Sequence, residues 1–104
     1  MKWLEKCSPG DARRYALIEA ALKNHPDLLK WLFCEDKPEM IYGASDILNR
    51  ARGFSSGEKT LIKFACDIWF DTEFCPVSSL LKLDDDNYRN VVSALLLLRN
   101  YDHS

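Results

Sequence analysis

The chain has 104 residues, of which 47% are hydrophobic and 29% are charged, and its formal net charge at pH 7 is −2. This length predicts a single domain, residues 1–104, with enough apolar material for one core. The acidic balance disfavours a general nucleic-acid binder, and the longest apolar run, 94–98, is far shorter than the roughly 20 residues of a membrane span.

The first helix of the chain is marked by a clear start signal. Ser8 can cap it, Pro9 suits its first turn and Asp11 places a negative charge near its positive end. We expect this helix to continue to about Lys23. Pro26 then permits a second, short helix over residues 27–33.

Two further helices are predicted in the middle of the chain. One covers 47–52 and ends at Gly53, which we expect in the left-handed conformation that often closes a helix. The next covers 56–70, because Ser55 and Glu58 have the spacing of a capping box. Its apolar residues recur at helical spacing and are expected to be buried: Leu61, Phe64, Ala65, Ile68 and Trp69.

The last third of the chain predicts a short helix over 77–82 and a long final helix capped by Asp84 or Asp85. Four consecutive leucines, Leu95 to Leu98, cover most of the circumference of that final helix. A helix that is apolar nearly all round is surrounded by protein, so we expect it at the centre of the bundle, or extending into a partner. The pattern predicts an all-α fold, a compact bundle of four main helices and one or two short ones.

The start of the helix at 56–70 permits two nucleotide-binding interpretations. A phosphate-binding loop needs four residues between its glycines, but three separate Gly53 from Gly57, and Glu58 then precedes Lys59. Residues 54–62 resemble the signature motif of the ABC-type and chromosome-maintenance ATPases, which implies that the helix start contacts a γ-phosphate held by another subunit. Such an ATPase also needs a phosphate loop and a metal-binding carboxylate, which this sequence lacks, and helix capping accounts for the same residues.

The cysteines and histidines show no catalytic or metal-binding pattern. There is no Cys-x-x-Cys pair, and His25 and His103 lie far from every cysteine in the sequence. We therefore expect no structural metal, no cofactor and no enzyme activity. Four reduced, mostly buried thiols and the lack of a signal peptide at residues 1–6 favour a cytoplasmic protein. The thiols are Cys7, Cys34, Cys66 and Cys75.

Two charged groups are candidate contact surfaces. The basic group would bind an anionic partner, and consists of Arg50, Arg52, Lys59 and Lys63. The acidic group consists of Asp84, Asp85 and Asp86, at the start of the last helix. Together with the nearby Asp67, Asp71 and Glu73, it could dock a basic partner. A calcium-binding EF-hand loop fails, because Arg89 and Leu95 occupy the positions that require glycine and glutamate.

The aromatic residues suggest a docking patch. In the runs Trp31-Leu32-Phe33 and Trp69-Phe70, adjacent side chains point about 100° apart on a helix, so one ring of each run is expected near the surface. The candidate patch consists of Trp31, Phe33, Phe70 and Phe74.

These observations favour a non-enzymatic protein-binding module, similar in size and composition to the small inhibitors of phages and mobile elements. One alternative is a nucleic-acid-associated regulator, because the helices at 56–70, 77–82 and 85–101 follow the order of a helix-turn-helix unit. A recognition helix that begins with three aspartates disfavours this reading. A third alternative is a homodimer that shares the surface of Leu95 to Leu98. A membrane partner is not expected.

Overall fold

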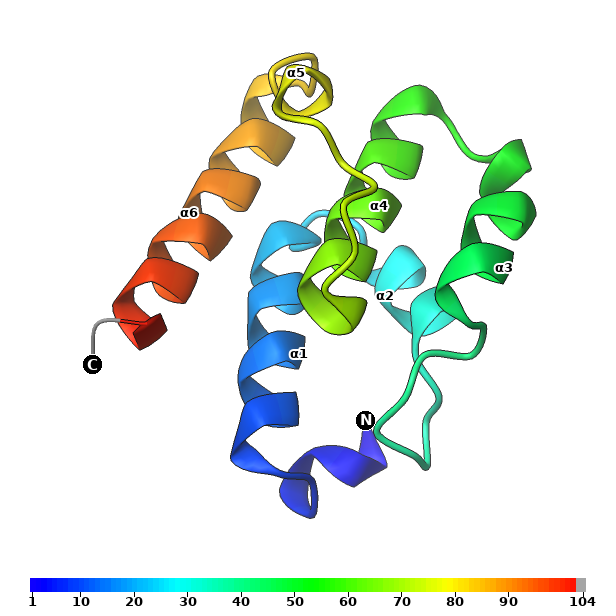
Figure 1. Cartoon of the computed structure of the whole chain (residues 1–104), viewed down its shortest axis with the longest axis vertical. Coiled ribbons are helices and arrows are strands. Elements are labelled where there is room, and N and C mark those ends of the chain that lie inside the picture. Colours follow the sequence, from blue (N-terminus) through cyan, green and yellow to red (C-terminus); the bar gives the residue numbers. More distant parts are fainter. Residues whose placement is uncertain (103–104) are drawn as a thin grey trace.

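Residues 1–102 are described by a computed structural model, and they form an all-helical bundle (Figure 1). The α-helices of this part are α1 (Pro9–Ala21), α2 (Pro26–Leu32), α3 (Ala44–Arg50), α4 (Ser56–Phe70), α5 (Val77–Leu80) and α6 (Asp85–Asp102). Two 3-10 turns, η1 (Lys2–Glu5) and η2 (Ala51–Gly53), complete the helical elements. Within this part the only extended pairing is an isolated bridge between Phe33 and Met40, so the all-α prediction is confirmed. His103, one of the two histidines considered above, lies outside the described residues.

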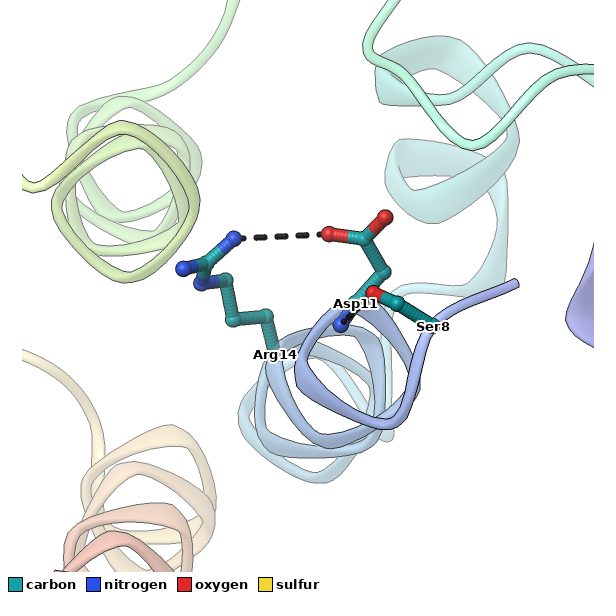
Figure 2. Close-up of polar contacts among 3 residues, drawn as sticks. All are labelled: Ser8, Asp11 and Arg14. Atoms are coloured by element: carbon teal, nitrogen blue, oxygen red, sulfur yellow. Dashed lines mark hydrogen bonds and ion pairs between the residues drawn. The ribbon is translucent and has the colours of Figure 1, made fainter.

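The predicted start of α1 is confirmed by its hydrogen bonds (Figure 2). The Oγ atom of Ser8 accepts a hydrogen bond from the backbone N–H of Asp11 at 3.2 Å, and Pro9 occupies the first turn. Arg14 reaches back to Asp11, with 3.3 Å between its Nη1 atom and the carboxylate. The cap satisfies one of the free N–H groups that every helix start exposes.

The capping box of α4 is also confirmed. The Oγ atom of Ser55 accepts from the N–H of Glu58 at 3.2 Å, and the Glu58 carboxylate accepts from the N–H of Ser55 at 3.0 Å. The backbone N–H of Ser55, assisted by the Ser55 side chain, stabilises the ionised carboxylate and holds the pKa of Glu58 below its ordinary value. At α6 the cap is Asp84, whose Oδ1 atom accepts from the N–H of Asn87 at 2.9 Å.

The left-handed glycine predicted at position 53 is wrong. No described glycine has a positive φ, and Gly53 belongs to η2, which prolongs α3 by one tight turn. The left-handed residue is instead Asp71, with φ 60° and ψ 40°, at the end of α4. Aspartate is one of the few residues other than glycine that often adopts this conformation, so it can end a helix.

The centre of the bundle is α4. It lies between α1 and α3 in Figure 1 and packs against both. Its buried residues are Leu61, Ile62, Phe64, Ala65 and Cys66, while Ile68 and Trp69 are half-buried. They meet α1 on one side and Ile47 of α3 on the other, and the core is completed by α2 and by Trp3 of η1. The Cα radius of gyration, 13.0 Å, is that of a compact body of about 100 residues.

The prediction that the last helix is central is wrong. α6 stands at one side of the molecule and packs mainly against α1 (Figure 1). It buries a narrow stripe, Asn87, Val91 and Ala94, at the spacing of one helix face. Since consecutive residues on a helix point about 100° apart, α1 cannot cover four leucines in a row. Most of the leucine run therefore remains outside the core.

Candidate functional site

Four of the exposed large hydrophobic side chains among the described residues lie on α6: Tyr88, Leu95, Leu96 and Leu97. Leu95, Leu96 and Leu97 are 41%, 54% and 38% exposed, and only Leu98 is half-buried. Leu95 and Leu96 lie on the same side of the helix as Tyr88, Arg89 and Val92, which precede them by one to two turns. We call the face that they share the α6 stripe; it consists of Asp85, Tyr88, Arg89, Val92, Leu95, Leu96 and Arg99.

The α6 stripe carries apolar side chains around the half-buried Val92, an exposed cation at Arg89, and one further charge at each end. Val92 lies at its centre, Asp85 is in the first turn of the helix and Arg99 is near its end. Asp85 and Arg99 are exposed and form no ion pair with any side chain that the structure describes. Val77 and Leu81, also exposed, lie in or beside α5, which adjoins the beginning of α6 in Figure 1. This arrangement can bind a helix of another protein, with the apolar centre supplying area and the ends setting its direction.

The predicted aromatic patch does not form. Phe33 is only 2% exposed, because it follows the last turn of α2 and points into the bundle, where its ring meets Trp69 edge-on at 4.9 Å and Tyr15 at 5.2 Å. Phe74 is half-buried against the core, and Phe70, which is 37% exposed, is the last residue of α4.

Trp31 lies near the opposite end of α4. It lines a cavity of about 360 Å³ together with Glu58, which is in the first turn of that helix, whereas Phe70 ends it about 20 Å away. The half-buried Trp31 ring packs edge-on against Phe54, with 5.0 Å between centroids, and against Tyr42 at 5.9 Å. Phe54 is thus part of this surface, although sequence reasoning placed it only in a helix-start motif.

The basic group is brought together in part. Arg52, Lys59 and Lys63 line a groove of about 280 Å³ between η2 and α4, with Leu48 and Ala51 beside them. None of the three cations forms an ion pair within the described residues. Arg50 is separate, because its guanidinium lies over the ring of Tyr42 at 4.2 Å. The role of the group in binding an anion remains a prediction.

Two of the acidic residues considered above, Asp67 and Asp84, accept hydrogen bonds that stabilise the fold. The Asp67 carboxylate accepts hydrogen bonds from the Thr72 hydroxyl and from the N–H groups of Phe74 and Cys75, at 2.8 and 2.9 Å for the latter two. It therefore organises the connector between α4 and α5. Asp84, although exposed, caps α6, so Asp85 and Asp86 are the exposed carboxylates at the start of α6 that have no such capping role.

A hydrogen-bonded network that sequence reasoning missed joins His25 to Asn87 and Asp84, which lie far from it in the sequence. The Nδ2 atom of Asn87 donates to Asp84 at 3.2 Å, so its Oδ1 atom is left to accept from Nε2 of His25 at 3.0 Å. His25 and Asn87 are 62 residues apart, and no spacing signal could have paired them. These hydrogen bonds connect the start of α2 to the start of α6. The described residues lining the adjacent cavity include no cysteine, serine or threonine that His25 could activate.

The four cysteines are free thiols, and the prediction that most are buried is wrong. Only Cys66, inside α4, is buried, while Cys7, Cys34 and Cys75 are half-buried. Burial raises the pKa of the Cys66 thiol from 9.0 to about 12, and the nearby Asp67 carboxylate adds to the shift. Burial likewise raises the pKa of Tyr15 to about 12, with Glu19 and Glu35 contributing.

These two pKa shifts predict a loss of stability in alkali. Above pH 9 the unfolded chain releases the Cys66 proton and the folded chain retains it, so the free energy of unfolding falls as pH rises, by at most about 1.4 kcal/mol per pH unit for one group. The contribution is fully present below pH 9. Urea unfolding at pH 8 to 10.5 should show a shallower fall for Cys66→Ala, and for Tyr15→Phe above pH 10, than for the wild-type chain. Identical slopes in all three proteins would contradict the assignment.

No metal centre is indicated by the described side chains: within residues 1–102 no three His, Cys, Asp or Glu residues come close enough together to hold an ion. In the same part of the chain, no helix has both the length and the apolar character that crossing a membrane requires. Comparisons of the chain with protein-family models, with curated proteins and with solved structures find no match.

Proposed function

We propose that this chain is a non-enzymatic protein-binding module that docks a helix of another protein molecule against the α6 stripe. The observation that carries the proposal is the exposure of Leu95 and Leu96, 41% and 54%, on a helix whose opposite side packs against α1. Covering the remaining apolar surface of one such leucine contributes roughly 1 kcal/mol. Large aliphatic side chains gathered on one helix face commonly mark a contact surface.

The charges at the ends of the stripe favour a particular partner. Its helix would run antiparallel to α6, with a basic residue near Asp85 and an acidic residue near Arg99. The antiparallel direction also aligns the two helix dipoles favourably. The partner would therefore carry an amphipathic helix with apolar residues at spacings of three and four between those charges.

The helix-turn-helix alternative receives less support. α5 has only four residues, and α6 packs mainly against α1. The first turn of α6 carries Asp85 and Asp86, whose negative charges would be repelled by the phosphates of DNA.

The proposal can be tested with a matched pair of surface variants. Leu96→Lys places a charge in the stripe, whereas Ile41→Lys places the same charge on a side chain of similar exposure, 47%, in the segment between α2 and α3. We expect wild-type and Ile41→Lys protein to retain the same partner at about 0.5 M NaCl, since an apolar contact depends little on salt screening. Leu96→Lys should lose it, and a peptide of the partner's amphipathic helix should compete. Equal retention by Leu96→Lys, or binding that disappears with salt, would contradict the proposal.

A further inference from the structure

The residues of the α6 stripe are arranged symmetrically about Val92. Asp85 and Arg99 each lie seven residues from it, and Tyr88 and Leu96 each lie four residues from it. Arg89 and Leu95 each lie three residues from Val92. Because steps of three, four and seven residues return to the same side of a helix, all of these side chains share one face.

This symmetry makes the stripe complementary to itself. If two copies of α6 lie antiparallel with a two-fold axis at Val92, residues equidistant from Val92 oppose one another. Asp85 of each copy then meets Arg99 of the other, Tyr88 meets Leu96, and the aliphatic part of Arg89 packs near Leu95. The contact would contain two ion pairs at its ends and, between them, aliphatic and aromatic side chains flanked by Arg89 of each copy. A parallel pairing would place Asp85 against Asp85 and Arg99 against Arg99, which is repulsive at both ends.

We propose that the chain forms an antiparallel homodimer through the α6 stripe, with its two-fold axis at Val92. This inference rests on the proposed function, because it uses the same docking surface, and it names a second copy of this chain as the occupant. The exposed positions of Asp85, Leu96 and Arg99 leave that face accessible to a second copy.

The size of the contact sets the expected affinity. From Asp85 to Arg99 the stripe is about 21 Å long, which is four helical turns. Two such helices bury less than the roughly 800 Å² per partner of a standard stable interface. We therefore expect a reversible dimer with a dissociation constant on the order of tens of micromolar.

Charge reversal at the two ends of the stripe tests the pairing. Asp85→Arg makes both ends basic, and Arg99→Asp makes both ends acidic, so each variant should repel its own copy. Mixed together, the two variants restore attraction at both ends of an antiparallel heterodimer. Sedimentation equilibrium at about 200 µM should give wild-type protein a mass approaching twice 12.0 kDa. Each variant alone should remain near 12.0 kDa, with at least tenfold weaker association, and their equimolar mixture should regain the wild-type mass.

Two controls make the outcome decisive. Thermal unfolding must show that both variants are folded, and Ile41→Lys should dimerise like the wild type. A wild-type chain that is monomeric at about 500 µM, or a mixture that stays monomeric while the wild type dimerises, overturns the proposal. If the wild type is monomeric but Leu96→Lys still loses a protein partner, self-association fails and the proposed docking function stands. If the wild type is monomeric and Leu96→Lys also retains the protein partner, both the homodimer and the proposed docking function are wrong.

Discussion

Phe33→Ala is expected to destabilise the fold by about 3–5 kcal/mol, the range typical of a large aromatic side chain removed from a packed core. Phe33 is 2% exposed, and its ring contacts those of Tyr15, Trp69 and Trp3, the last at 6.1 Å between centroids. Alanine would leave a cavity among three other aromatic rings, none of which can move into it without losing its own contacts. Urea unfolding followed by circular dichroism measures the loss.

The matched control for this experiment is Phe70→Ala. Phe70 is 37% exposed at the end of α4, so the same truncation should cost less than about 1.5 kcal/mol. The comparison separates a core ring from a surface ring of the same chemistry. Equal losses in the two variants, or a larger loss for Phe70→Ala, would contradict the assignment of Phe33 to the core.

The second large effect is expected at Asp67. Asp67→Ala removes the acceptor of three hydrogen bonds, which come from Thr72 and from the backbone of Phe74 and Cys75. Hydrogen bonds to a charged group contribute about 1.5–3 kcal/mol each at most, and partly buried donors left unpaired add a penalty. Because this connector is partly solvated, we expect a total loss of about 2–4 kcal/mol in the free energy of unfolding.

Asp86→Ala serves as the control for the charge alone. Asp86 is exposed in the first turn of α6, where a carboxylate contributes about 0.3–1 kcal/mol through the helix dipole. Asp67→Asn, which keeps one carbonyl acceptor, should lose less than Asp67→Ala. If all three variants lose the same small amount, Asp67 belongs to a solvated acidic face and not to the framework of the connector.

The sequence signals that succeeded are local ones. The caps at Ser8, Ser55 and Asp84 were predictable because each involves a side chain and a backbone group three residues away. For the same reason α4 was predicted with its observed bounds, Ser56–Phe70. The buried part of its apolar stripe follows from helical periodicity alone.

Predictions that depend on tertiary placement were less successful. The run Leu95 to Leu98 shows that α6 is apolar on most sides, but not how many neighbours are available to cover it. Spacing within Trp31-Leu32-Phe33 shows that the two rings diverge, but not which of them faces the core. The bond between His25 and Asn87 joins two helix starts that only the folded chain brings together.

The candidate site shows the same division. Arg52, Lys59 and Lys63 meet because η2 and α4 are adjacent in sequence as well as in space. Arg50 leaves the group for the ring of Tyr42, a contact that no charge pattern reveals. The symmetry of the α6 stripe, in contrast, is visible in the sequence, but its meaning depends on knowing that α1 covers the opposite side of the helix.

The central claim is that the outward face of α6 is where this chain meets another protein molecule, here a second copy. The most direct test is a set of amide NMR spectra recorded from about 20 µM to about 1 mM. The account predicts concentration-dependent shifts or broadening for Tyr88, Val92 and Leu96, with the signals around Trp31 and Phe54 unchanged. Signals along α6 that stay fixed over this range, or changes confined to the surface around Trp31 and Phe54, would contradict it.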